Sequence, residues 1–215
     1  MASEMQFEHI KKEPNRYLER VLQIMRQGIF EEKGRLKRAS KESIKNQQLQ
    51  QTFDIIGKRE ESDFICCSKE YETEKELTRE DIYFHLPNAE RTIVFFAECK
   101  RLPKPKKSKD NSHDYVTGLH SNGKSPCGGI ERYKLGLHGR PAGKLRDYGV
   151  IGYVESRSVK FWEGTINMSL GSRYPKDSLL EPKIGLMDEY VSTHTYDCNV
   201  KGEFKMHHFL INLTQ

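Results

Sequence analysis

The clearest structural signal in the chain is Thr92-Ile-Val-Phe-Phe-Ala-Glu-Cys-Lys100. Its first six residues are apolar almost without interruption, which is typical of a strand with both faces covered. Glu98 and Lys100 follow two positions apart, so their side chains point to one face of the strand while Cys99 points to the other. The stretch predicts a central strand that ends with a carboxylate and an ammonium on one small surface.

The segment Asp81-Ile-Tyr-Phe-His-Leu86 predicts a second strand that pairs with the first. It is rich in aromatic and branched residues and stops at the turn 87–91, which begins with proline. Asp81 and Glu98 lie symmetrically about the middle of that turn. If the two strands pair directly, Asp81 therefore faces Glu98 across the ladder.

These two carboxylates predict a cation site. Neighbouring carboxylates repel each other unless a positive charge lies between them, and hard oxygen ligands suit Mg²⁺ or Mn²⁺. Such an ion polarises a phosphate and lowers the pKa of a bound water, and Lys100 would orient or deprotonate that water or stabilise charge on the phosphate. The competing interpretation is a surface ion pair, since charged residues make up 31% of the chain.

Length and hydropathy suit one domain with extensions. The chain has 215 residues, enough for one sizeable core, and it lacks the roughly 18 to 20 consecutive apolar residues of a membrane span. Residues 1–6 show no signal-peptide pattern. We expect a cytoplasmic protein with no membrane partner.

Periodicity predicts the remaining elements. We expect helices at 15–27 and 41–56, a strand at 64–67, a helix after Gly129, a strand at 148–154, a helix at 159–170 and a C-terminal β-hairpin within 190–213. The fold class is therefore α/β (α+β), a mixed central sheet flanked by helices in the order α-β-β-β-α-β. We expect residues 1–40 to be an N-terminal helical extension and residues 41–215 to be the main domain.

Most of the net charge of +5 lies in one segment. Between Arg101 and Ser125 there are six basic residues and two acidic ones, and segment 101–128 has the composition of a mobile loop. Its lysines would neutralise nucleic-acid phosphates, although a charge run of this kind is equally often only solvated. These lysines are Lys104, Lys106, Lys107 and Lys109.

The two quoted strands together resemble the D…(D/E)-x-K signature of the PD-(D/E)XK, or restriction-endonuclease-like, nuclease superfamily, and the expected element order matches its core. Glu80 stands where a proline often precedes the first aspartate. The resemblance covers residues 41–156. It implies that Asp81 and Glu98 are metal ligands and that Lys100 is the catalytic lysine.

The resemblance also implies contributions from two helices. Many members add an acidic residue from the first core helix, for which Glu42 is our candidate and Glu19 the rival. The second core helix often supplies a polar residue, here Glu131, Arg132 or Lys134, of which Arg132 is our candidate for contact with nucleic acid. Solvated helix charges are the competing interpretation for all of these residues.

The function that we predict is Mg²⁺- or Mn²⁺-dependent hydrolysis of phosphodiester bonds in DNA, in prokaryotic defence or DNA processing. RNA stays open as a substrate, and so do a homodimer and a partner protein in a multi-subunit system. The alternative is a catalytically inactive nuclease-fold subunit that binds nucleic acid or serves in assembly.

The expected terminal hairpin carries His194, His207 and His208. Neighbouring residues of a strand point to opposite faces, so at most one of His207 and His208 can share a site with His194. We interpret all three as structural histidines.

Overall fold

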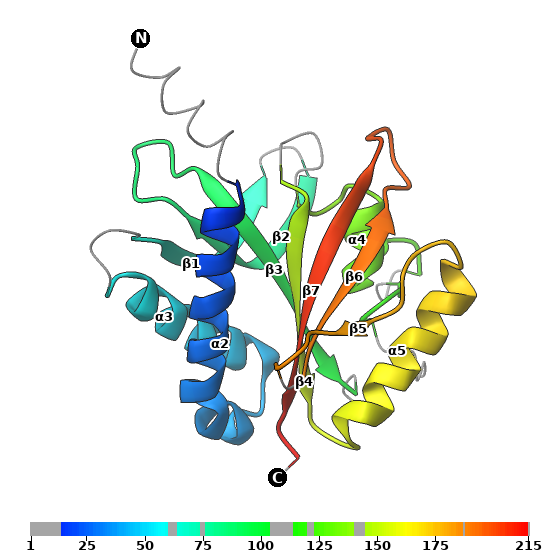
Figure 1. The fold of residues 1–215 in the computed structure, drawn as a ribbon, viewed down its shortest axis with the longest axis horizontal. Helices are drawn as coiled ribbons and strands as arrows, with labels where there is room; N and C mark the ends of the chain where they lie inside the picture. The colour runs from blue at the N-terminus through cyan, green and yellow to red at the C-terminus, as the bar shows by residue number, and fades with distance from the viewer. Residues whose placement is uncertain are drawn as a thin grey trace.

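The computed structural model describes residues 14–59, 64–73, 76–103, 114–119, 123–139, 145–186 and 188–214. Over these residues the chain forms four helices and a seven-stranded sheet (Figure 1). The helices are α2 (Pro14–Arg38), α3 (Glu42–Gly57), α4 (Gly129–Lys134) and α5 (Val159–Arg173). The strands are β1 (Cys66–Thr73), β2 (Glu76–His85), β3 (Ile93–Leu102), β4 (Asp147–Val154), β5 (Glu181–Pro182), β6 (Glu189–Thr195) and β7 (Glu203–Asn212).

The sheet is mixed, and helices cover both of its faces. Its strand order is β1-β2-β3-β4-β7-β6-β5, in which β3, β4 and β7 run parallel and the other neighbouring pairs run antiparallel. Helices α2 and α3 pack on one face, and α4 and α5 pack on the other (Figure 1). The expected mixed α/β class is confirmed, and α3-β1-β2-β3-α4-β4 follow one another in the expected order.

Alternation along β3 decides which side chains reach the site. Phe95, Ala97 and Cys99 are buried in the core beneath α2 and α3, whereas Phe96 and Leu102 are buried in the core beneath α4 and α5. The even-numbered positions therefore point toward α4. Glu98 and Lys100 occupy two of these positions, so the strand presents them on the α4 side.

The register between β2 and β3 confirms the predicted hairpin. Ile82 pairs with Ala97 and Tyr83 with Phe96. One further step along this antiparallel ladder places Asp81 opposite Glu98, as the symmetry of the turn predicts. The ladder is irregular next to His85, close to the turn. This irregularity does not change the register at the opposite end of the hairpin, where Asp81 and Glu98 lie.

Helix α2 continues through Gly28 to Arg38 and is therefore longer than the predicted 15–27. A Cβ atom at Gly28 would lie 2.4 Å from a ring carbon of Phe53 on α3. The glycine therefore allows two helices to cross closely instead of ending one of them. Val21, Leu22 and Met25 of α2 are fully buried, so this described part of the segment 1–40 contributes to the main core.

Part of the segment 101–128, expected to be a mobile loop, packs into the core instead. Tyr115 and Val116 are fully buried. The carbonyl oxygens of Asp114, Tyr115 and Val116 accept hydrogen bonds of 2.8 to 3.1 Å from the first N–H groups of α4. Those N–H groups have no partner within their own helix, which is the physical reason why this irregular stretch is held in place.

The C-terminal hairpin is confirmed, since β6 and β7 pair antiparallel. The two-residue strand β5 extends the sheet beyond β6, and its shortness left no sequence signal. Among the described residues, no helix is long and apolar enough to cross a membrane.

Candidate active site

Three carboxylates and one lysine converge around the second half of β3. Glu98 and Lys100 belong to β3 itself, Asp81 to β2, and Glu42 is the first residue of α3. Each of them acts electrostatically on the others. The four residues come from three elements. Packing of α3 against the sheet brings Glu42 to the other three residues.

Glu98 lies at the centre of this cluster and is 2% exposed. Its Oε1 is 2.5 Å from Lys100 Nζ and 3.3 Å from Arg132 Nη1, and its Oε2 is 3.3 Å from His138 Nδ1. Burial alone would raise the pKa of Glu98, but Lys100, His138 and Arg132 hold it well below its usual range. The carboxylate is therefore ionised at neutral pH.

Asp81 lies beside Glu98 with its charge poorly compensated. Its Oδ2 accepts a hydrogen bond of 2.8 Å from the backbone N–H of Cys99. Desolvation raises the pKa of Asp81 to about 8, and the carboxylates of Glu98 and Glu42 add to that rise against the opposing effect of Lys100. A carboxyl group that keeps its proton to such a pH marks a place where positive charge is lacking.

Glu42 completes the group from the start of α3. Its Oε2 accepts a hydrogen bond of 3.1 Å from the backbone N–H of Arg101. Desolvation raises the pKa of Glu42, and Glu98 adds to the rise while Lys100 opposes it. Two of the three carboxyl groups are thus harder to ionise than a free side chain.

Lys100 supplies the nearest positive charge. Burial disfavours its ammonium form, yet Glu98 and Asp81 hold the pKa of Lys100 above its usual value. The side chain therefore stays protonated at neutral pH. A Cβ atom at Gly129 would lie 3.6 Å from Lys100 Cε, so the lysine stem runs directly beneath the first turn of α4.

The other predicted site residues divide into three groups. Arg132 joins the cluster through Glu98. Glu19 is exposed and lines a different hollow together with His207, so the structure brings Glu42, and not Glu19, to the carboxylates. The four loop lysines lie outside the described residues.

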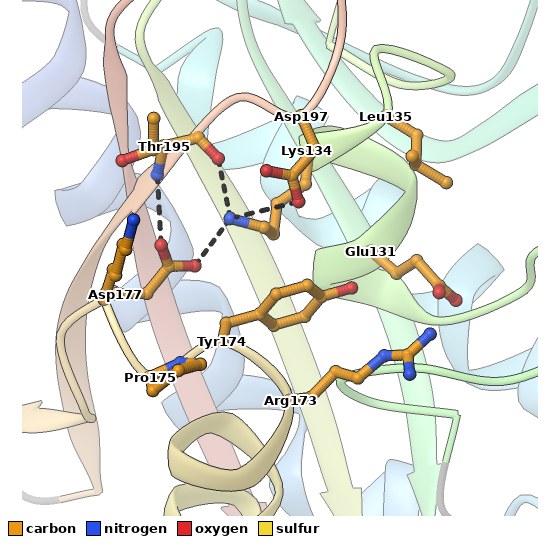
Figure 2. A pocket seen from close by; sticks show the side chains of 10 residues that line it. Glu131, Lys134, Leu135, Arg173, Tyr174, Pro175, Asp177, Thr195 and Asp197 are labelled. Atoms are coloured by element: carbon orange, nitrogen blue, oxygen red, sulfur yellow. Dashed lines mark hydrogen bonds and ion pairs between the residues drawn. The ribbon is translucent and has the colours of Figure 1, made fainter.

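The remaining polar residues of α4 point away from the cluster. Glu131 Oε2 accepts a hydrogen bond from the backbone N–H of Gly118. Lys134 is 2.7 Å from Asp177 and is buried with it. Both side chains line a separate hollow between α4 and the end of α5, seen in Figure 2. Its charges balance, with Lys134, Arg173 and Lys176 against Glu131, Asp177 and Asp197.

His138 is a site residue that the sequence did not reveal. It follows α4 within the segment Leu135-Gly-Leu-His-Gly139. No carboxylate or second histidine stands at a metal-ligand spacing from it there, so its approach to Glu98 depends wholly on how the chain turns after α4.

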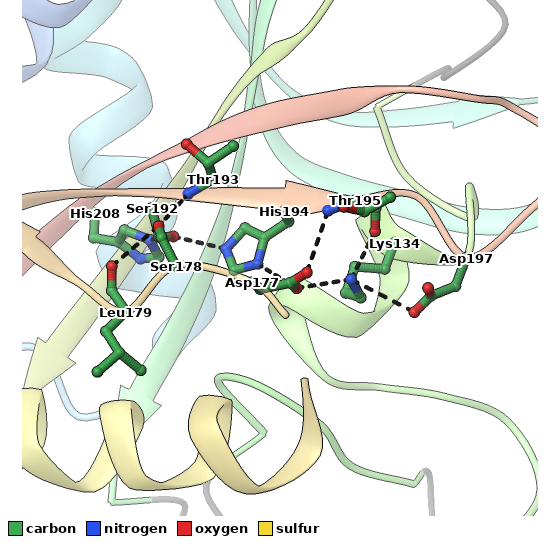
Figure 3. Close-up of polar contacts among 10 residues, drawn as sticks. All are labelled: Lys134, Asp177, Ser178, Leu179, Ser192, Thr193, His194, Thr195, Asp197 and His208. Carbon is green, nitrogen blue, oxygen red and sulfur yellow. Dashed lines mark hydrogen bonds and ion pairs between the residues drawn. The ribbon is translucent and has the colours of Figure 1, made fainter. Parts of the chain in front are cut away.

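A second polar cluster is buried between β6, β7 and the α5–β6 connection (Figure 3). Ser192 Oγ is 2.6 Å from His194 Nε2 and 2.7 Å from His208 Nε2. His194 Nδ1 is 2.8 Å from Asp177 Oδ2, and His208 Nδ1 is 3.0 Å from the hydroxyl of Tyr115. We call these five residues the histidine chain.

One assignment of donors and acceptors satisfies all four hydrogen bonds of the histidine chain. Asp177 accepts from His194 Nδ1, so the neutral ring presents Nε2 as an acceptor to the Ser192 hydroxyl. Ser192 then accepts from Nε2–H of His208, whose Nδ1 accepts from Tyr115. Desolvation lowers the pKa of both His194 and His208, which keeps both rings in this neutral form.

A serine, a histidine and an aspartate in line can act as a hydrolytic triad. Ser192 and His194 are each 1% exposed, so no substrate reaches the hydroxyl. His207 faces the other side of the sheet, where Nε2 is 3.1 Å from Asp147. The interpretation of the three histidines as structural fits these contacts.

The carboxylate cluster fits a divalent ion by its donor set. It offers hard carboxylate oxygens of the kind that Mg²⁺ and Mn²⁺ prefer, two of its carboxyl groups have raised pKa values, and Glu98 Oε2 has no hydrogen-bond partner among the described residues. Within the same residues, no three His, Cys, Asp or Glu side chains already stand in metal-ligand geometry. An ion would therefore need these side chains to move.

Comparison with known proteins adds no family assignment. No family model matches the chain, and neither a curated protein nor a solved structure is significantly similar to it.

Proposed function

We propose that the chain is a divalent-metal-dependent nuclease that hydrolyses phosphodiester bonds in DNA, and that α3-β1-β2-β3-α4-β4 form a restriction-endonuclease-like core. One observation carries the proposal: Glu42, Asp81, Glu98 and Lys100 meet at the end of a buried central strand. The unfavourable ionisation of Asp81 and Glu42 supports it, because natural proteins keep such conflicts mainly where a ligand resolves them.

The residues take distinct roles in this proposal. Oxygens of Asp81 and Glu98 would hold Mg²⁺ or Mn²⁺, with Glu42 as a further acidic contact. When bound, the ion supplies Lewis-acid polarisation of the phosphate and lowers the pKa of a water. The ammonium of Lys100 lies beside Glu98, where it would stabilise negative charge on the phosphate.

Positive charge for the substrate would come from two places. Arg132 is partly exposed and its Nη1 lies 3.3 Å from Glu98 Oε1, so its guanidinium can turn to a phosphate oxygen. The loop lysines Lys104, Lys106, Lys107 and Lys109 would neutralise further phosphates without reading sequence.

The test is cleavage of linear, circular and single-stranded DNA by the wild type and by Lys100→Ala, with Mg²⁺, with Mn²⁺ and with EDTA. We expect metal-dependent cleavage that falls by about 100- to 1,000-fold in Lys100→Ala, the usual loss when a charge-stabilising group is removed. Lys160→Ala is the matched control, since Lys160 is exposed on α5 and pairs with Glu163. Equal cleavage by wild type and Lys100→Ala would contradict the proposal.

The second candidate is a nuclease-fold subunit that binds nucleic acid without cutting it. One observation favours it: Lys100 and Arg132 already neutralise Glu98 without an ion. The same assay decides between the two, because this candidate predicts DNA binding that falls with added salt and no cleavage with any divalent ion.

A further inference from the structure

His138 is held rigidly just after α4. Gly136 and Gly139 flank the short turn with φ angles of 69° and 78°, a conformation that glycine adopts without strain. The carbonyl oxygen of Gly139 accepts a hydrogen bond of 3.0 Å from the Tyr148 hydroxyl. The His138 ring is 1% exposed and meets Tyr133 edge-on at 5.4 Å. The ring therefore has little freedom to move.

The polar atoms of this ring are unlike those of an ordinary buried histidine. Neither ring nitrogen of His138 makes a well-aligned hydrogen bond within the described residues, and the same holds for Glu98 Oε2, 3.3 Å from Nδ1. Both ring nitrogens of His208, by contrast, have partners. Because buried polar atoms are nearly always paired, His138 and Glu98 form an incomplete polar site.

The contacts of Glu98 are divided between its two oxygens. Lys100 and Arg132 approach Oε1, whereas His138 approaches Oε2. The lysine and the arginine have long, flexible side chains that can turn to a phosphate. His138 is the one rigid group among the described residues that can fix the direction of the carboxylate through Oε2.

We propose that His138 is a positioning residue of the cation site. His138 Nδ1 lies 3.3 Å from Glu98 Oε2 and would donate to that oxygen once an ion turns the carboxylate, so that the remaining lone pairs face the position between Glu98 and Asp81. Partners of this kind orient carboxylate ligands, and their removal costs metal affinity. The inference rests on the proposed nuclease function, and it adds a residue that acts through Glu98 without contacting the substrate.

The test is calorimetric titration of MnCl₂ into the full-length wild type, His138→Leu, His138→Asn and His207→Asn. We expect the Kd for Mn²⁺ to rise by about 10- to 100-fold in His138→Leu. His138→Asn should stay within about threefold of wild type, because an amide N–H can replace Nδ1–H. His207→Asn is the matched control, a histidine of similar burial on the other side of the sheet.

A second readout separates positioning from loss of structure. In cleavage assays the Mn²⁺ concentration for half-maximal rate should rise for His138→Leu, while kcat at saturating Mn²⁺ should change by less than about threefold. Thermal melts of the ion-free variants identify any that are unfolded. If His138→Leu is unfolded, His138→Asn is compared with wild type, and a Kd for Mn²⁺ raised by more than about threefold contradicts the inference.

The outcomes distinguish this inference from the function on which it rests. If the wild type binds no Mn²⁺ and cuts no DNA, both the proposed function and the inference are contradicted. If the wild type binds Mn²⁺ and folded His138→Leu binds it equally well, the inference alone is overturned. A directly coordinated histidine nitrogen in the electron paramagnetic resonance spectrum of bound Mn²⁺ also overturns it, since His138 would then be a ligand.

Discussion

The molecule contains two polar clusters, the carboxylate cluster and the histidine chain, and they are built in opposite ways. In the histidine chain each donor meets an acceptor from Tyr115 to Asp177. In the carboxylate cluster desolvation and like charges raise the pKa of Asp81 and Glu42, and Glu98 Oε2 lacks a hydrogen-bond partner within the described residues.

The difference separates a structural polar network from a candidate site. A fully satisfied network holds one arrangement of the strands and gains nothing from a ligand. A cluster with conflicting charges costs free energy in the ion-free protein, and a cation that lies between the carboxylates would recover it. Three measurements test this difference.

The largest expected effect is on cleavage. We expect Glu98→Gln to lower the rate of DNA cleavage by at least about 1,000-fold, because it removes a ligand charge and a partner of Lys100. Ser192→Ala should leave the rate within about twofold, since Ser192 is buried in the histidine chain. Gel assays with Mn²⁺ measure both rates. A large loss of cleavage in a folded Ser192→Ala protein would contradict the structural role of the histidine chain.

The next effect is on stability. Ser192→Ala leaves Nε2 of both His194 and His208 without the hydroxyl that joins them. We expect the free energy of unfolding to fall by about 1 to 3 kcal/mol, the cost of leaving a buried polar group unpaired. Urea titration followed by circular dichroism measures this, and an unchanged midpoint would mean that the network is not satisfied as described.

The smallest effect is a dependence on pH with opposite signs in the two clusters. The pKa of Asp81 is raised from 3.8 to about 8, so between these values the folded state holds a proton that the unfolded state has lost. Stability from this group is complete below the unfolded value and falls as pH rises toward 8. Asp81→Asn should therefore be more stable than wild type at pH 9 in EDTA, by about 1 to 2 kcal/mol after allowance for solvent screening.

Asp177 is the control for that measurement. Burial opposes its ionisation, but His194 and Lys134 hold the pKa of Asp177 below its usual value. Its contribution to stability is present above the unfolded pKa and is lost as pH falls through the folded pKa. Asp177→Asn should thus destabilise the protein at pH 9, where Asp81→Asn stabilises it. The same sign for both variants would remove the distinction between the clusters.

The features that the sequence predicted correctly depend on residues close together in the chain. The pairing of Ile82 with Ala97 followed from the symmetry of one short turn, and the shared face of Glu98 and Lys100 followed from the period of a strand. The prediction from sequence missed the second half of α2, from Gly28 to Arg38. The close approach of Phe53 to Gly28 belongs to neither helix alone.

The element order from α3 to β4, the central hairpin and the carboxylate–lysine pair on β3 were all predictable from the sequence, since each depends on residues close together in the chain. The folded structure is needed to see that Glu42 reaches the cluster while Glu19 does not, that Lys134 turns away to Asp177, and that His138 returns to Glu98. These outcomes depend on how α3 and α4 pack against the sheet, and packing is a property of surfaces that meet only in the folded chain.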